Sequence, residues 1–207
     1  MSEDHIAFEP ADLDSPKSNR PSTTTPDWSR EAKGFFAWCP SRSLLASIRA
    51  YQRARHSNLP WHFLTRKFAV LRHRFWSSVT GADIPLNSRI AGGLLLPHPN
   101  GVVVHPNSDI GPNCLLFQQV TLGSLAGRAP RLGGNVVVGA GAKLLGGIRI
   151  GDHARIGANA VVLEDVPAGA TSVGIPARVL SHPQVQPGAS DPAVRGRGAE
   201  DASVTRR

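Results

Sequence analysis

The sequence predicts an all-β fold, a parallel β-helix of six-residue repeats preceded by a short helical segment. Aliphatic residues recur every six positions, and Gly often follows them, as in Val138-Gly139 and Ile150-Gly151. Such a period indicates a solenoid in which each repeat is one short strand plus a turn. Three hexapeptides close a triangular coil, and stacked coils bury a core that one coil could not. The series are Ile84, Ile90, Leu96 and Val102, then Val104, Ile110, Leu116 and Leu122, then Leu132, Val138, Leu144, Ile150, Ile156 and Val162.

The two ends of the chain differ from this repeat region, which spans residues 81–180. Residues 1–40 and 181–207 are rich in Ser, Thr, Pro and charge. They cannot bury enough apolar surface to offset their ordering entropy, so both are expected to be disordered. The N-terminus lacks the apolar region of a signal peptide, and the apolar runs are too short to span a bilayer. With two isolated cysteines, Cys39 and Cys114, a cytoplasmic protein without disulfides is expected.

Residues 41–80 form the predicted helical segment. Ser43 can cap a first helix, and Pro60 fits the first turn of a second. Both predicted helices carry apolar residues at three- and four-residue intervals, so we expect a helical pair that docks on the rest of the chain or on a neighbouring subunit. These residues are Leu44, Leu45, Ile48 and Tyr51 in the first helix, and Trp61, Leu64, Phe68, Leu71 and Phe75 in the second.

The formal net charge of +8 is concentrated in this helical segment. No acidic residue occurs from Ser41 to Ala82, whereas eight Lys or Arg lie between Arg42 and Arg74. No zinc-finger spacing or RNP-like aromatic pattern accompanies them, so no nucleic-acid partner is expected. A basic solvated helix face, contact with an anionic membrane surface and attraction of an acidic substrate remain as interpretations.

One interruption of the period predicts a loop. The stretch Gly123-Ser124-Leu125-Ala126-Gly127-Arg128-Ala129-Pro130-Arg131 is longer than one hexapeptide, and Arg128 occupies the next aliphatic position. Such an off-period, small-residue stretch is typical of a loop extruded from a corner of a coil.

Several motifs outside the repeat resemble the catalytic domain of serine acetyltransferases. They are Asp83-Ile84-Pro85, Leu96-Pro97-His98, Gln119-Val120-Thr121-Leu122-Gly123, Gly139-Ala140-Gly141-Ala142-Lys143-Leu144-Leu145-Gly146 and Gly174-Ile175-Pro176-Ala177-Arg178-Val179. The resemblance covers about residues 80–180 and implies a left-handed β-helix. It also implies transfer of an acetyl group from acetyl-CoA to an acceptor hydroxyl, which is that of L-serine in the family.

The proposed chemistry requires a base, because an alcohol is a poor nucleophile at neutral pH; histidine commonly serves. The resemblance places the catalytic histidine at His98 and its aspartate partner at Asp83. Asp83 would orient the imidazole and stabilise the imidazolium, as the third member of a hydrolase triad does. The alternative interpretation of His98 is a surface residue in a Pro-Asn-Gly turn.

The resemblance also implies the binding site of the co-substrate. Coenzyme A in the family lies in the groove between two neighbouring β-helices, and its contacts correspond to Gly123, Ala140 and Ala158, with Arg155 available for phosphate. A shared groove implies an oligomer, a homotrimer or a dimer of trimers. Each small residue could instead simply allow a corner to turn. Gly139-Ala140-Gly141-Ala142 is not a nucleotide loop, because it lacks the Gly-Lys-Ser/Thr ending.

Two departures from the family concern the acceptor. Pro97 replaces the Asp that precedes the catalytic His, and Ala129 replaces the His of an Arg-His-Pro loop, whereas Arg128 remains to bind a carboxylate. The acceptor is therefore either L-serine or a sugar hydroxyl in polysaccharide biosynthesis. A zinc-dependent hydratase like the carbonic anhydrases of this fold is a third interpretation. The spacing of His98 and His105 does not match its three-His site, so no metal is expected.

Overall fold

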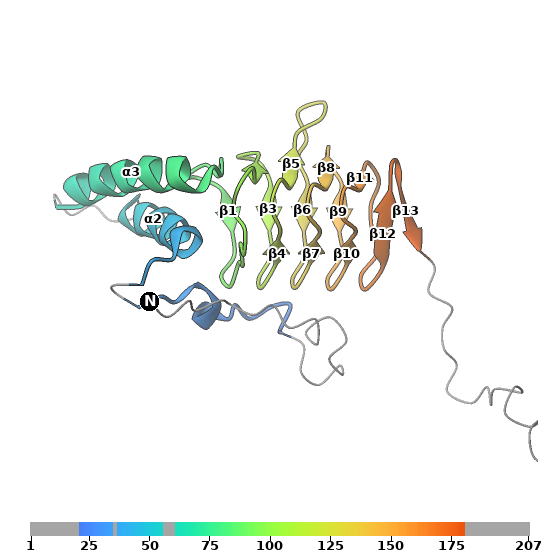
Figure 1. Cartoon of the computed structure of the whole chain (residues 1–207), viewed down its shortest axis with the longest axis horizontal. Coiled ribbons are helices and arrows are strands. Elements are labelled where there is room, and N and C mark those ends of the chain that lie inside the picture. The colour runs from blue at the N-terminus through green and yellow to red at the C-terminus, as the bar shows by residue number, and fades with distance from the viewer. Residues whose placement is uncertain (1–20, 35–36, 56–60, 181–207) are drawn as a thin grey trace, which may run out of the picture.

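The computed structural model describes residues 21–34, 37–55 and 61–180; Trp61 and His62 are described in the backbone only. A pair of helices lies at one end of a row of stacked coils (Figure 1). A short 3-10 helix, η2 (Trp28–Glu31), precedes α2 (Pro40–Arg55) and α3 (Trp61–Thr80). The strands that follow are β1 (Arg89–Ile90), β2 (Val103–Val104), β3 (Asp109–Ile110), β4 (Leu115–Leu116), β5 (Thr121–Gly123), β6 (Arg131–Leu132), β7 (Val137–Val138), β8 (Lys143–Leu145), β9 (Arg149–Ile150), β10 (Arg155–Ile156), β11 (Val161–Val162), β12 (Thr171–Gly174) and β13 (Ala177–Leu180).

These strands form the three faces of a prism. The described strands pair in the orders β1-β3-β6-β9, β13-β12-β10-β7-β4 and β11-β8-β5-β2. Pairing is parallel throughout except between β12 and β13, which end the solenoid as an antiparallel pair. Val137 pairs with Arg155, and Lys143 with Val161, so one regular coil is three hexapeptides long. The predicted parallel β-helix of hexapeptide repeats is confirmed.

The core contains all of the predicted aliphatic residues, one from each hexapeptide, together with buried residues at the corners of the coils. They form a single buried cluster, in which members of one row lie above one another in parallel register. Burying one such side chain contributes about 1.5–3 kcal/mol. The row inside the β2-β5-β8-β11 sheet is Ile84, Val104, Leu122, Leu144 and Val162.

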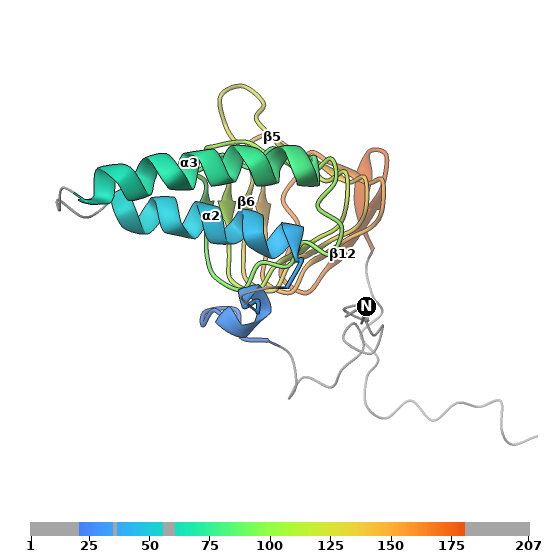
Figure 2. The ribbon, with the colours of Figure 1, turned by 60° about the vertical axis from the view of Figure 1, so that its left-hand side comes forward.

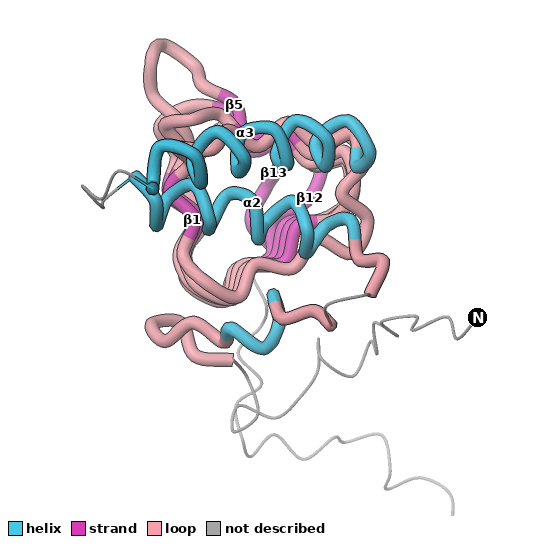
Figure 3. Tube along the Cα trace, turned by 90° about the vertical axis from the view of Figure 1, so that its left-hand side faces the viewer, coloured by secondary structure: helices cyan, strands magenta, loops and turns pink. Residues whose placement is uncertain are grey.

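Helix α2 closes the open end of the prism beneath the first coil. Its residues Leu44, Leu45 and Ile48 are buried and belong to the same cluster as the solenoid core. Figures 2 and 3 show α2 and α3 lying side by side across this end of the coils. A solenoid needs such a cap because the coil at its end would otherwise expose the core to water.

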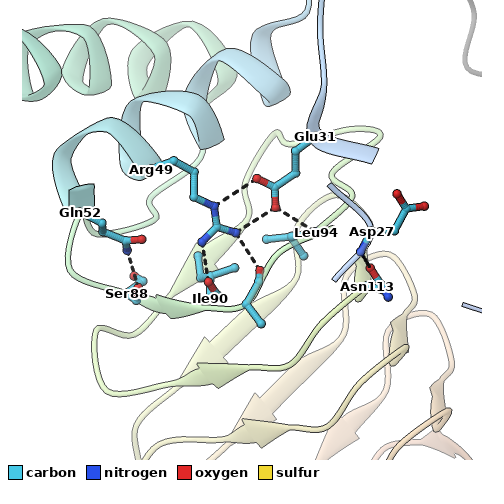
Figure 4. A network of polar contacts seen from close by, with 9 residues as sticks. Asp27, Glu31, Arg49, Gln52, Ser88, Ile90, Leu94 and Asn113 are labelled. Atoms are coloured by element: carbon cyan, nitrogen blue, oxygen red, sulfur yellow. Dashed lines mark hydrogen bonds and ion pairs between the residues drawn. The ribbon is translucent and has the colours of Figure 1, made fainter. Parts of the chain in front are cut away.

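Polar side chains complete the hydrogen bonding of the first coil, which has no preceding coil to pair with. Arg49 donates from Nη1 to the Ile90 carbonyl at 2.5 Å and from Nη2 to the Ala91 carbonyl at 2.7 Å. Its ion-pair partner Glu31, at 2.9 Å, accepts the backbone N–H of Leu94 at 3.2 Å (Figure 4). Backbone groups without hydrogen-bond partners are costly to bury. The Glu31–Arg49 pair supplies partners to the backbone groups at the free edge of the first coil.

The segment before α2 is more ordered than its composition predicts. The buried Asn113 amide accepts the N–H of Asp27 at 2.8 Å and donates to the carbonyls of Ser22 and Thr25 at 2.8 and 2.9 Å. The prediction of disorder over residues 1–40 is therefore wrong for residues 21–34, which gain hydrogen bonds and contacts that composition does not reveal. Residues 1–20 and 181–207 lie outside the described part of the chain.

The two predicted helices are confirmed, with two differences in detail. Helix α2 begins at Pro40, so Ser43 lies inside it; the predicted N-cap is wrong, and the buried Ser43 hydroxyl has no partner among the described residues. Pro60 and the Trp61 side chain lie outside the described residues. The rest of the α3 stripe does not dock on this chain, because its side chains are exposed. The exposed fractions are 63% for Leu64, 65% for Phe68, 66% for Leu71 and 54% for Phe75.

We predict that Arg49→Ala lowers the free energy of unfolding by about 3 kcal/mol, because it leaves Glu31 unpaired in a site where its side chain is 9% exposed. Urea unfolding followed by circular dichroism measures this. Arg53→Ala, one helical turn further on and exposed, is the matched control and should change stability little. Equal losses in the two variants would show that the Glu31–Arg49 pair does not anchor the first coil.

Candidate functional site

His98 lies in a turn that is longer than its equivalents in later coils. The chain here passes from the β4 face to the β2 face, and residues 97–101 replace the three-residue turns 117–119, 139–141 and 157–159. Because stacking continues on both sides of the turn, the extra residues have no place in the packed interior and bulge outward. His98 is accordingly exposed.

Asp83 lies beside this turn, three residues after the end of α3. Its side chain is exposed, and its backbone pairs with that of Val103. Its N–H donates to the Val102 carbonyl at 2.8 Å, and its carbonyl accepts from Val104 at 2.9 Å. Gly101 likewise donates to the Gly81 carbonyl at 2.9 Å. Asp83 and the His98 turn therefore share one edge of neighbouring coils. Both side chains are exposed, and no hydrogen bond joins them within the described residues.

The small residues assigned to coenzyme A continue along the same edge. The Gly141 N–H donates to the Gln118 carbonyl at 2.9 Å, and the Asn159 N–H donates to the Ala140 carbonyl at 2.8 Å, so the turns stack on one another. Ala158 is exposed and Ala140 is half-buried. Arg155 lies on β10, directly before the turn that carries Ala158.

Gly123 and Arg128 lie at a different edge, where the chain leaves β5. The predicted loop projects there from the solenoid (Figure 1). Leu125 and Arg128 exchange backbone hydrogen bonds of 2.9 and 3.1 Å, which closes the loop as a small hairpin. A Cβ atom on Gly123 would lie 2.7 Å from Leu145 Cδ2, so only glycine fits at the base of the loop without displacing that side chain.

One chain therefore separates the predicted site residues into two groups. His98, Asp83, Ala140, Ala158 and Arg155 cluster around the edge before the β11-β8-β5-β2 sheet, whereas Gly123 and Arg128 lie at the edge after it. The full width of this sheet lies between them. Within one chain, a site that includes both groups would have to span this sheet.

Two further residues at the His98 edge were not singled out from the sequence. The Gln118 Oε1 atom is buried and has no hydrogen-bond partner among the described residues. Lys143 donates from Nζ to the Gln119 carbonyl at 3.0 Å and to the Gly141 carbonyl at 3.1 Å, which braces two successive turns. Many residue types at these turn positions would keep the six-residue period, so the pattern carries no signal for them.

His105, His153 and the buried Cys114 have structural partners. His105 Nδ1 accepts the Asn107 N–H at 3.2 Å, and His153 Nδ1 lies 2.8 Å from the Asn135 amide nitrogen. Burial raises the pKa of the Cys114 thiol to about 12, so it is not an available nucleophile at neutral pH. Within the described residues, no group of three His, Cys, Asp or Glu side chains could hold a metal ion.

Comparison with known proteins adds the evidence for ancestry. A profile described as "Bacterial transferase hexapeptide (six repeats)" matches residues 129–164. The serine acetyltransferase of Helicobacter pylori (strain J99) is 43% identical over 125 residues, which cover 58% of this chain and 71% of that protein. The chain belongs to the serine acetyltransferase family. Members of this family are acyltransferases.

A second relative and a solved structure agree with this assignment. The serine acetyltransferase of Synechococcus elongatus is 48% identical over 106 residues, or 49% of this chain and 43% of that protein. A solved serine acetyltransferase in complex with CoA is 34% identical with a TM-score of 0.59, covering 69% of this chain and 58% of the other. The solenoid is thus the left-handed β-helix predicted from the resemblance. The chain spans about half the length of the Synechococcus elongatus protein and of the solved chain.

No helix in the described part of the chain is both long and apolar enough to cross a membrane. Cys39 and Cys114 are both free thiols.

Proposed function

We propose that this serine acetyltransferase family member is an O-acetyltransferase that uses acetyl-CoA as co-substrate. The observation that carries the proposal is the outward bulge of the His98 turn beside Asp83, on an edge lined by small residues. The acceptor hydroxyl approaches this edge, and the acetyl thioester lies along the turns of Ala140 and Ala158, with Arg155 near a phosphate of CoA.

In the proposed reaction, His98 acts as general base. Its imidazole takes the proton of the acceptor hydroxyl while the hydroxyl oxygen attacks the acetyl carbonyl carbon. The tetrahedral adduct then expels the CoA thiolate, which breaks the C–S bond and leaves an O-acetyl ester. The thiolate takes the proton from the imidazolium, so His98 returns to its starting state. Asp83 stabilises the imidazolium between these steps.

The active unit in this proposal is a homotrimer or a dimer of trimers. The support is the separation of the predicted residues between two edges of one sheet, because cyclic packing of prisms brings one edge of each chain against the other edge of its neighbour. Coenzyme A would then lie in the groove between two chains. The His98 edge would come from one chain and the Gly123–Arg128 loop from the next.

Two acceptors are consistent with the residues of the site. L-serine is the substrate in the names of the relatives, and Arg128 can pair with its carboxylate. A sugar hydroxyl in polysaccharide biosynthesis is the alternative, which Pro97 and Ala129 favour. Pro97 offers no carboxylate for the ammonium group of serine, and Ala129 is 8% exposed, with little room for a larger side chain.

We predict that His98→Asn lowers kcat for acetyl transfer by about 10²–10⁴-fold, the usual contribution of a general base. Release of free CoA thiol from acetyl-CoA measures this, with L-serine and a panel of sugars as acceptors. His153→Asn is the matched control: it removes an imidazole from a residue with φ 59°, a conformation that Asn tolerates.

The acceptor panel separates the alternatives. Turnover with L-serine that His98→Asn abolishes supports the family substrate, and turnover with a sugar alone supports polysaccharide modification. Wild-type rates in His98→Asn would contradict the general-base role for every acceptor.

The shared site can be tested by mixing two defective chains. His98→Asn and Arg128→Ala should each be nearly inactive as homo-oligomers. After co-refolding in equal amounts, about one quarter of the sites in a cyclic trimer would combine an intact His98 from one chain with an intact Arg128 from its neighbour. We therefore expect activity to return to about a quarter of wild type. No recovery would show that both residues act within one chain.

We also propose that α3 contacts an anionic membrane surface. Its exposed row, Leu64, Phe68, Leu71 and Phe75, is flanked by Lys67, Arg72 and Arg74. In a pairing of two copies through this row, these like charges would face each other and oppose association. An apolar helix face bordered by Lys and Arg is instead typical of helices that lie in a membrane interface.

Sedimentation with vesicles tests this contact. Wild type should bind vesicles that contain phosphatidylglycerol and not vesicles of phosphatidylcholine alone. Leu71→Ser, on the exposed face, should reduce binding, whereas Leu125→Ser, equally exposed on the loop, should not. If Leu71→Ser instead changes the sedimentation coefficient of the free protein, the row contacts a second copy and the membrane proposal is wrong.

A further inference from the structure

A row of charged residues runs along the outside of the β1-β3-β6-β9 sheet, next to the extruded loop. The pairing register places Arg89 beside Asp109, Asp109 beside Arg131, and Arg131 beside Arg149. Neighbouring parallel strands lie about 4.8 Å apart, so each side chain directly faces the next. Ile150 pairs with Val166, so the register continues to Asp165 beside Arg149. The row therefore holds three arginines and two aspartates.

The charges in this row are not balanced. Asp109 forms ion pairs with Arg89 and, at 3.4 Å, with Arg131. In the part of the chain that the structure describes, no ion pair involves the guanidinium of Arg149. Arg131 and Arg149 are direct neighbours, and like charges in this position destabilise a sheet. The Asp165 carboxylate accepts the backbone N–H of Arg149 at 2.8 Å and forms no ion pair with its guanidinium. An anion bound between Arg131 and Arg149 would relieve the repulsion between them.

The loop adds a fourth arginine to the same place. A Cβ atom on Gly147 would lie 2.9 Å from Arg128 Cβ, so the absence of a side chain there lets the Arg128 stem lie against the solenoid. Together these residues enclose a pocket of about 360 Å³, lined by Arg89, Asn107, Gly127, Arg128, Ala129, Arg131, Gly147 and Arg149. Asn107 also fixes one wall, because its carbonyl accepts from Arg89 Nη2 at 2.9 Å.

We propose that this arginine pocket is a binding site for a phosphate group. Four guanidinium groups and the carboxylates of Asp109 and Asp165 leave a net charge of two positive units around it. A carboxylate ligand would neutralise one unit, whereas a phosphate monoester carries about 1.5–2 negative charges at pH 7. Guanidinium groups bind phosphate oxygens through paired N–H donors, and the pocket offers several such donors from different directions.

The site goes beyond the proposed acetyl transfer and does not depend on it. It rests on Arg131 and Arg149, which have no role in the proposed chemistry, and only Arg128 borders both sites. A phosphate held here would lie at the base of the loop, beside the edge that contributes Gly123. The ligand is therefore either a phosphorylated acceptor, the 3′-phosphate of CoA or free phosphate, which share the same recognition chemistry.

Isothermal titration of inorganic phosphate into the full-length protein, without acetyl-CoA or acceptor, tests the site. Arg149→Gln should weaken binding about tenfold or more, the effect of losing charge-assisted hydrogen bonds. Arg53→Gln removes the same charge from an exposed position on α2 and should leave the affinity unchanged. Circular dichroism of each variant verifies that the solenoid is folded.

A variant that binds phosphate more tightly distinguishes a specific site from nonspecific electrostatic attraction. Asp109→Asn removes the carboxylate that competes for Arg89 and Arg131, so it should tighten phosphate binding several-fold. Gly147→Ala should weaken binding because the new methyl group displaces Arg128. The proposal is overturned if wild type binds no phosphate, if Arg149→Gln binds as wild type does, or if Arg53→Gln weakens binding equally.

Three competing ligands identify the source of the phosphate. Stronger binding of glucose 1-phosphate than of inorganic phosphate indicates a phosphorylated acceptor. Stronger binding of CoA than of dephospho-CoA, with the difference lost in Arg149→Gln, indicates the CoA phosphate. Equal binding of all phosphates indicates the free ion, and each result supports the pocket. Failure of acetyl transfer with intact phosphate binding would remove the proposed function alone.

Discussion

The in-register stacking of one aliphatic side chain on the next is the constraint on which the rest of this structure depends. Each coil contributes one inward residue to each face, and parallel pairing holds these residues above one another. An insertion within a strand would shift every later residue between core and solvent. Extra residues are therefore tolerated only at the corners. Both insertions, the His98 turn and the loop before β6, occur at corners.

The same stacking creates a difficulty at the first coil, where the ladder has no further partner. The chain resolves it with helices, whose apolar residues close the core while their polar side chains bond to free backbone groups. Arg49 and Glu31 bond to three backbone groups of this coil, and His73 Nε2 lies 2.8 Å from the Ile84 carbonyl oxygen. This requirement explains why residues 21–34, poor in apolar side chains, nevertheless pack along the solenoid.

The prism shape also determines how a site can be built. Residues at equivalent turns of successive coils line one edge, so His98, Ala140 and Ala158 form a continuous track. The loop that carries Arg128 leaves from another edge, across a whole sheet. The proposed transferase site therefore relies on a neighbouring chain. The arginine pocket, by contrast, is complete within one chain, because pairing register and the loop bring its four guanidinium groups together.

The fold was largely predictable because its signal is repeated: each coil shows the same six-residue period, and tertiary contacts occur between residues that the period already relates. The positions of His98, the loop and the helices followed from where that period breaks. Contacts between non-repeated segments were not predictable. The sequence could not show that Asn113 binds Ser22 and Thr25, that α2 begins at Pro40 rather than after Ser43, or that the α3 stripe remains exposed.

By itself, then, the sequence determined the solenoid, its inward residues and the family motifs, because local periodicity and spacing are written along the chain. Only the tertiary structure decided which coil faces need capping, how the site residues divide between two edges, and where arginines become direct neighbours. Arg131 and Arg149 look like ordinary outward residues in the sequence. They become a site because one turn of the coil places them side by side, and proximity between residues distant along the chain is what folding alone creates.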